Sequence, residues 1–237
     1  MLEILYQDDY LAVVNKPFGL LVHRTGLDAG ETRFALQMLR DQIARQVWPV
    51  HRLDKGTSGV LVFALNADVA RTMGQWFEAG GQMQKRYQAI VRGWPQPAEG
   101  EINHPLSRMP DDARAGREEV QEASSRFRVE QRLNLPLPYG TFEQTRCALV
   151  SLWPETGRRH QLRRHMKHIA HPIIGDSTHG KGPLNRDVAG FLGQARLWLH
   201  ARTLSLPHPV TQQALNFEAE PGAEWGLWMP FALQPDA

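Results

Sequence analysis

Residues 51–60 read HRLDKGTSGV and lie between an apolar segment that ends at Val50 and a strand-like run through Leu65. The stretch places Asp54 between a cationic residue and a turn rich in Gly, Thr and Ser, where backbone amides lie close by. A carboxylate at such a strand edge can serve catalysis. An arbitrary loop aspartate more often caps a turn or pairs with a neighbour such as Arg52. The rest of the chain decides between these two interpretations.

The segments on either side of this stretch show the periodicities of strands and helices. Strands are predicted over residues 2–6, 10–15, 60–65, 85–93, 123–132, 144–152 and 198–206. Helices are predicted over 30–46, ended by Pro49, over 66–77, with Asn66 as N-cap and Gly80-Gly81 as the stop, and over 158–168. Many strands with few helices favour an α+β fold built on a largely antiparallel sheet.

One long stretch lacks this periodicity. Residues from Pro95 to about Glu119 are polar and rich in Pro, Asp, Arg and Gly. Strand-like sequence resumes on both sides, so a surface loop is predicted here rather than a linker between domains.

Length and composition exclude several classes of protein. At 237 residues the chain suffices for one large domain or two small ones. Its 42% hydrophobic and 22% charged residues are typical of globular proteins. No apolar run approaches the roughly 18 residues of a membrane span, and residues 1–5 do not resemble a signal peptide. The single cysteine, Cys147, excludes an internal disulfide. A cytoplasmic protein is therefore expected.

The net charge of +2 hides an uneven distribution. Residues 158–167 hold four arginines and a lysine, whereas no Lys or Arg follows Arg202 and several acidic residues do. A local basic face with an acidic tail fits an anionic partner. The charge pattern alone does not identify that partner.

Further short motifs occur in series with the Asp54 stretch. They are NKPFG at 15–19, KRY at 85–87, TGRRHQLRRHM at 156–166, HPIIGD at 171–176 and LHAR at 199–202. Together with HRLD-x-x-T-S-G, these motifs resemble those of the RluA-type pseudouridine synthases, in that family's order and near its spacing. Each piece is weak, but the series is specific.

The resemblance implies the pseudouridine synthase catalytic fold. That fold has a central mixed, mainly antiparallel sheet with flanking helices and an RNA-binding cleft between two subdomains. A single catalytic domain over residues 1–237 is expected. Relatives with a separate RNA-binding S4 domain carry it before the KPxG turn, and the 15 residues before Lys16 leave no room for it.

The resemblance also implies roles for three residues. Asp54 matches the catalytic aspartate, which acts as nucleophile or base at the sugar. Arg163 matches the arginine that pairs with this aspartate and keeps it ionised. Tyr87 matches the tyrosine that stacks on the target base. Without the resemblance, Arg163 would be a phosphate contact and Tyr87 an aromatic residue of a core strand.

A second group of residues is expected to bind RNA. Arg52 matches the arginine implicated in filling the space left by the flipped base. The remaining candidates, as phosphate contacts, are Lys16, Arg158, Arg159 and Arg164. For Arg159, a solvated helix face is an almost equal alternative.

Two other kinds of site are not supported by the spacing. His160, His165, His168 and His171 lack the HExxH pattern and neighbouring Cys or acidic ligands, so phosphate or packing contacts are expected instead of a metal site. His51 and Ser58 lie near Asp54, but the chain has no G-x-S-x-G elbow of a hydrolase. Neither a metal nor another cofactor is expected.

The sequence thus predicts a monomeric, cofactor-independent enzyme that isomerises a uridine to pseudouridine in structured RNA. The expected substrate is tRNA, at uridine 65 in the region of its T arm. A ribosomal RNA pseudouridine synthase of the same family is the first alternative. The second is an RNA-binding or RNA-folding protein without catalysis.

Overall fold

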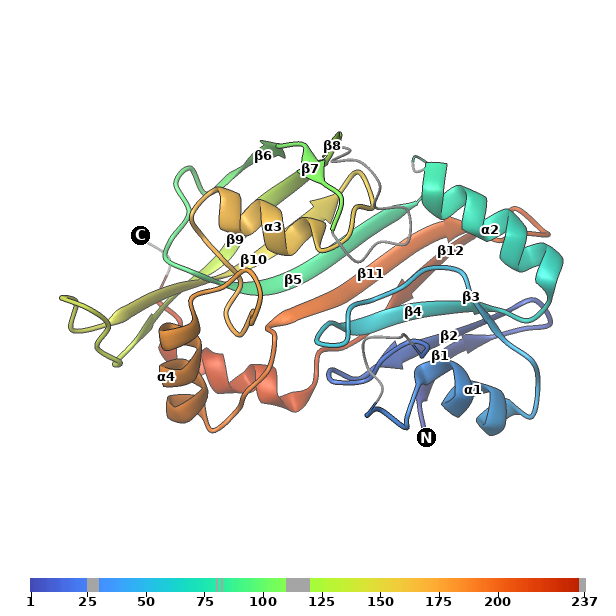
Figure 1. Ribbon diagram of the computed structural model, residues 1–237, viewed down its shortest axis with the longest axis horizontal. Helices are drawn as coiled ribbons and strands as arrows, with labels where there is room; N and C mark the ends of the chain where they lie inside the picture. Colours follow the sequence, from blue (N-terminus) through green and yellow to red (C-terminus); the bar gives the residue numbers. More distant parts are fainter. Residues whose placement is uncertain (25–29, 80, 82, 110–119, 235–237) are drawn as a thin grey trace. The chain divides into compact units, whose positions relative to one another are not determined.

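The computed structural model describes residues 1–24, 30–79, 81, 83–109 and 120–234, and it divides into two compact units (Figure 1). Unit 1 comprises Met1–Arg86 and Leu199–Gly222. Unit 2 comprises Tyr87–Trp198 and Ala223–Ala237. The expected single catalytic domain stays a prediction.

Unit 1 is built on a mixed sheet. Its strands, in spatial order, are β1 (Glu3–Gln7), β2 (Leu11–Lys16), β4 (Ser58–Ala64) and β11 (Leu199–Pro207). Outside this order, β12 (Ala214–Glu218) pairs with β11 and β3 (Trp48–Pro49) pairs with β4. The pairing of β4 with β11 is parallel, and the others are antiparallel. Every residue of β4 is buried, because neighbouring strands border it and helices cover the sheet.

Two helices complete unit 1. α2 (Ala67–Ala79) packs Val69 and Met73 into the core of the sheet, and the side-chain oxygen of Asn66 accepts the Val69 N–H at 2.9 Å. This confirms the predicted N-cap. Gly80, half of the predicted stop, lies outside the described residues.

α1 (Ala35–Ile43) is shorter than predicted and ends where Ala44 turns into a left-handed conformation, with φ of 51°. Pro49 does not end this helix. It lies in β3, because the segment before the Asp54 loop pairs with β4.

Gly59 explains why the Asp54 stretch ends in Thr-Ser-Gly. Its φ is +111°, and a Cβ placed there would lie 2.1 Å from the carbonyl oxygen of Ala201 on β11. Only glycine lets the two strands approach this closely with such a backbone. The loop that carries Asp54 therefore enters β4 at a position that tolerates no side chain.

Unit 2 is built on an antiparallel sheet. β5 (Gln84–Arg92) starts in unit 1 and continues here beside β10 (Thr145–Pro154), β9 (Ser124–Leu135) and β6 (Glu99–Asn103). The predicted antiparallel pairing of 123–132 with 144–152 is confirmed. The loop predicted from Pro95 to Glu119 was placed wrongly in its first part, because β6 forms there by pairing with β9. Residues 110–119 lie outside the described residues.

Helices cover the sheet of unit 2, and a pair of short strands, β7 (Leu106–Ser107) and β8 (Val120–Gln121), lies beside it (Figure 1). α3 (Gln161–His168) packs on β10. α4 (Gly182–Leu192) and the 3-10 helix η1 (Ala223–Phe231) were not predicted. η1 places Trp225 and Trp228 edge-on against Trp198, with ring centroids 5.5 and 5.3 Å apart. A cluster of three tryptophans thus forms much of this core.

The architecture is α+β, as predicted, with a mixed and mainly antiparallel set of strands and flanking helices. Among the described residues, no helix combines the length and the apolar character that a membrane crossing requires.

Candidate active site

Asp54 lies in the loop between β3 and β4, and hydrogen bonds within unit 1 shape this loop. The Thr57 N–H donates to the carbonyl of Asp54 at 3.0 Å and closes a turn. The Gly19 N–H donates to the carbonyl of Lys55 at 2.8 Å, where Gly19 has a φ of +78°. The NKPFG turn and the HRLD loop, distant in sequence, are therefore joined. Asp54 is partly exposed.

Lys16 lies beneath these two segments and is completely buried. Its ammonium donates to three carbonyl oxygens, those of Leu20 at 2.7 Å, Pro17 at 2.9 Å and Lys55 at 3.3 Å. A buried ammonium in these contacts does not reach an RNA phosphate. The predicted phosphate contact is corrected: Lys16 braces the loop that carries Asp54.

His51 is held at the start of the loop. Its ring stacks on Phe77, with centroids 4.4 Å apart, and its Nε2 accepts the Val62 N–H at 3.1 Å. Burial, assisted by the charge of Lys85, lowers the pKa of His51 to about 3, so the ring is neutral at physiological pH. The acceptor role of Nε2 requires this neutral form.

Ser58 pairs with His200, not with His51. Ser58 Oγ and His200 Nδ1 are 2.9 Å apart, and Nε2 of the same ring lies 2.9 Å from the carbonyl of Ala219. Both side chains are buried. The ring therefore donates from Nε2 and accepts the Ser58 hydroxyl at Nδ1, which links the TSG and LHAR motifs structurally and makes no hydrolase triad.

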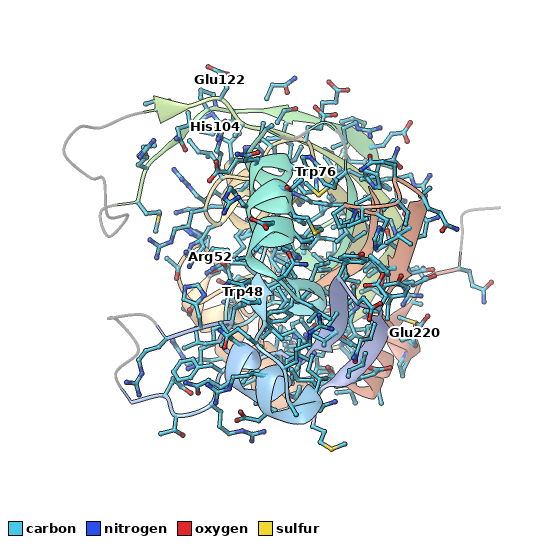
Figure 2. All side chains as sticks on the ribbon, turned by 90° about the vertical axis from the view of Figure 1, so that its right-hand side faces the viewer. Trp48, Arg52, Trp76, His104, Glu122 and Glu220 are labelled. Atoms are coloured by element: carbon cyan, nitrogen blue, oxygen red, sulfur yellow. The ribbon has the colours of Figure 1, made fainter. Side chains whose placement is uncertain are left out.

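Arg52 is exposed and extends outward from the loop (Figure 2). Burial and, to a lesser extent, the charge of Arg52 lower the pKa of His23. Arg52 and Asp54 lie on the same loop, and the side chain of Arg52 is exposed to solvent.

Tyr87 lies on β5 in unit 2. It is opposite Leu152 of β10 and is partly exposed. The strand predicted for the KRY motif is confirmed, and Tyr87 is not a fully buried core aromatic.

The side chain of Gln161 attaches the first turn of α3 to β9 and to the segment before the helix. Its Oε1 accepts from Thr156 Oγ1 at 2.7 Å and from the Arg158 N–H at 2.9 Å. Its Nε2 donates to the Ser124 carbonyl at 2.8 Å and to Ser125 Oγ at 2.9 Å. The helix begins at Gln161, three residues later than predicted, because His160 before it has a left-handed backbone with a φ of 54°.

Arg163, on α3, forms a buried ion pair with Asp176. Nε and Nη2 of the guanidinium donate to Oδ2 and Oδ1, both at 2.8 Å. The side chains of Arg163 and Asp176 are 8% and 1% exposed. Asp176 ends the HPIIGD motif and was not among the predicted site residues. The signal that could have indicated a role for Asp176 is its place directly after Gly175, in a motif that interrupts the preceding helical pattern.

The other three arginines of the TGRRHQLRR motif are partly exposed. Arg158 Nε donates to the Glu122 carbonyl at 3.0 Å, and Arg164 donates to the carbonyl and hydroxyl of Ser107 at 2.8 and 3.2 Å. These bonds hold the guanidinium groups near the surface. The phosphate contacts of Arg158, Arg159 and Arg164 stay predictions.

The histidines of this region have protein partners. His165 is buried between Ser125 Oγ and the His104 carbonyl, each 3.0 Å away. His171 Nδ1 donates to the Arg92 carbonyl at 2.7 Å, and the rings of His168 and His104 stack. The part of the chain that the structure describes contains no group of three or more His, Cys, Asp or Glu side chains able to hold a metal ion.

The predicted site residues are divided between the two units. Unit 1 holds Asp54 and Arg52 on a braced loop, and unit 2 holds Tyr87 and Arg163 on β5 and α3. The contact of Arg163 with Asp54 stays a prediction.

Comparisons with known proteins show the family to which the chain belongs. The family model described as RNA pseudouridylate synthase matches residues 10–168. The chain is 47% identical to tRNA pseudouridine synthase C of Vibrio cholerae, over 99% of the chain and 97% of the relative. It is 48% identical to the protein of that name from Yersinia pestis, over 98% of the chain and 91% of the relative.

Two solved structures share the fold. Human RNA Pseudouridylate Synthase Domain Containing 1 has a TM-score of 0.75 and 26% identity, covering 99% of this chain and 91% of its own. Human RNA Pseudouridylate Synthase Domain Containing 4 has a TM-score of 0.70 and 30% identity, covering 99% and 95%.

Proposed function

Because the chain belongs to the RNA pseudouridylate synthase family, we propose that it converts one uridine of tRNA to pseudouridine, at position 65 in the T arm. The observation that carries this proposal is the near full-length similarity to enzymes named tRNA pseudouridine synthase C. The series of site motifs supports it, since each lies on an element that positions it.

The reaction rearranges bonds within one nucleotide. The N1–C1′ bond of uridine breaks, a C5–C1′ bond forms, the proton of C5 leaves, and N1 ends with a proton. Nothing is oxidised or reduced and no group is imported. The protein's part is to bind RNA, expose the base and stabilise charge.

Asp54 is the group that acts at the sugar in this proposal. Its carboxylate serves as nucleophile or base while uracil detaches. Such a role demands a fixed carboxylate, because a small misplacement costs much of the rate. The brace of Lys16 and the turn closed by Thr57 supply that rigidity.

Arg163 and Tyr87 complete the catalytic set. In this proposal the guanidinium of Arg163 pairs with the carboxylate of Asp54. Tyr87 stacks on the uracil ring and takes part in removing the C5 proton. The partial exposure of Tyr87 leaves its ring accessible to a base.

The target uridine must leave its stack before Asp54 can reach the sugar, at a cost of a few kcal/mol. Arg52 fills the space that the flipped base leaves, which suits a cation that extends from the catalytic loop. Arg158, Arg159 and Arg164 grip phosphates, which gives affinity without sequence choice.

The proposal is tested with purified protein and equal amounts of tRNA transcript and ribosomal RNA fragments, followed by mapping of pseudouridine. We expect product in tRNA at position 65, and none in a transcript that carries cytidine there. Asp54→Asn protein serves as the control for contaminating activity. Modification of ribosomal RNA alone would refute the tRNA assignment and leave the role of Asp54 intact.

A further inference from the structure

Asp176 is a buried carboxylate of unit 2 that has no part in the chemistry described so far. Its Oδ1 accepts the N–H groups of Thr178 and His179, both at 2.9 Å, in addition to the two bonds from Arg163. Burial alone would raise the pKa of Asp176, but the Arg163 guanidinium and these amides lower it below its ordinary value. The side chain is therefore a carboxylate at neutral pH.

The backbone at Asp176 is fixed independently of Arg163. Asn185 on α4 accepts the Gly175 N–H and donates to the Asp176 carbonyl, both at 2.9 Å. Gly175 has a φ of +79°, and a Cβ there would lie 1.7 Å from the carbonyl oxygen of Arg196. The carboxylate thus occupies a position that α4 and the neighbouring backbone determine.

Asp176 and Arg163 are joined by two hydrogen bonds, and this number determines how firmly the guanidinium is oriented. One hydrogen bond leaves a guanidinium free to rotate, whereas two parallel bonds fix its plane. Asp176 binds the Nε–Nη2 edge, so it also fixes the direction in which Nη1 points. In addition, it compensates the charge of an arginine that is only 8% exposed.

We propose that Asp176 is a positioning residue that holds Arg163 in the orientation required for the isomerisation. This inference rests on the proposed function of Arg163. Asp176 is 1% exposed and acts through Arg163 rather than on the RNA.

A second ion pair in unit 2 provides a matched control. Arg196 pairs with Glu224 of η1, and their side chains are 1% and 23% exposed. This pair also joins a buried arginine to a carboxylate, but it lies among the core tryptophans and has no proposed role in catalysis. Removing the Glu224 charge should lower stability without changing turnover.

The kinetic experiment compares Asp176→Asn, Asp176→Glu, Arg163→Ala, Arg163→Ala/Asp176→Asn and Glu224→Gln in single-turnover reactions on saturating tRNA. Asp176→Asn should lower the rate by about 10²-fold and change the tRNA Kd by less than about threefold. The double variant should be no slower than Arg163→Ala, since both changes disable one device. Glu224→Gln should react at the wild-type rate. If Asp176→Asn does not fold, Asp176→Glu replaces it in the same rate comparison, and a smaller loss of rate is expected.

A second readout does not depend on activity. In protein with ¹⁵N-labelled arginine, the Nε–H signal of Arg163, identified by its loss in Arg163→Lys, should exchange slowly with water. Exchange should be fast in an Asp176 variant and slow in Glu224→Gln. Wild-type protein that makes no pseudouridine in tRNA would refute the proposed function, whereas the exchange rates test the positioning in free protein. Any of three results would overturn the inference. The rate losses of the two single variants could multiply in the double variant, or Glu224→Gln could lose as much rate as Asp176→Asn. The Nε–H exchange rate of Arg163 could also be the same in the Asp176 variants as in wild type.

Discussion

The ammonium of Lys16 lies 3.3 Å from the carbonyl oxygen of Lys55, which is the residue directly after Asp54. The same ammonium donates to Leu20 and Pro17, so one buried cation ties the KPFG turn to the catalytic loop. A basic residue that looks like a phosphate contact in the sequence is an internal support in the structure.

Replacement of Lys16 by Met should therefore act on stability and turnover rather than on RNA affinity. Loss of the ammonium leaves carbonyls without their donor, and we expect a cost of about 2 kcal/mol in the free energy of unfolding. The salt dependence of RNA binding should keep its wild-type slope. Urea unfolding and Kd values at several salt concentrations check this. If Lys16→Met reduced the slope of the salt dependence of RNA binding by about 1, Lys16 would be a phosphate contact after all.

Asp54→Asn should abolish turnover while the fold and RNA affinity stay close to wild type. The substitution keeps the size of the side chain and removes the charge that acts at the sugar. Pseudouridine formation and RNA binding are measured on the same preparation. Measurable product from a clean preparation would remove Asp54 from the catalytic role.

Arg163→Ala should lower turnover more than Arg159→Ala does. The first removes a buried guanidinium proposed to act on the chemistry, and the second removes a partly exposed one proposed to contact phosphate. Arg159→Ala should weaken RNA binding and flatten its salt dependence, because fewer counterions are released. If both variants lost affinity only, Arg163 would be a further phosphate contact.

The stability of the protein should fall as the pH falls below about 6.5. The pKa of His51 is lowered from 6.5 to about 3, and that of His179 to about 4, both chiefly by burial. Between the lowered and the ordinary pKa, the unfolded chain binds more protons than the folded one, so stability rises with pH across this window and is fully present above it. Each group contributes a slope of up to about 1.4 kcal/mol per pH unit.

Urea unfolding of wild type and His51→Gln at pH 7, 6 and 5 measures this slope. The variant should show the shallower pH dependence, because glutamine does not titrate. An equal slope in both proteins would mean that His51 is not held neutral by the fold.

Exhaustive treatment with EDTA should leave activity unchanged, and no nucleotide should be required. The expectation rests on an isomerisation without redox change and on the absence of a candidate ligand group among the described residues. Metal analysis of the purified protein accompanies the assay. A stoichiometric metal whose removal abolishes turnover would contradict this prediction.

Local sequence was sufficient for much of the fold. Periodicity predicted the strands that became β1, β2, β4, β5, β9, β10 and β11, and the Asn66 cap predicted the start of α2. These features depend on residues within a few positions of each other. The loop with Asp54 and Arg52 was likewise recognisable from one short motif, because its turn residues and its acid are contiguous.

Tertiary structure decided what depends on partners distant in the chain. β6 formed inside a stretch without periodicity, because β9 offered it a partner strand. Gln161, the first residue of α3, bonds to Ser124 and Ser125, which are 37 and 36 residues away. No local pattern records such pairings.

Partners distant in the chain also determine the surroundings of Lys16 and Arg163, the two buried cations discussed above. The sequence predicted Lys16 as a phosphate contact and Arg163 as the partner of Asp54, and both side chains are buried in the structure. Lys16 donates to carbonyl oxygens that include that of Lys55, 39 residues later in the chain. Arg163 forms its ion pair with Asp176. The sequence by itself determined the family, the residue types and the local elements. Only the folded chain determined which charges face inward, because burial of a charge depends on the partners that packing brings to it.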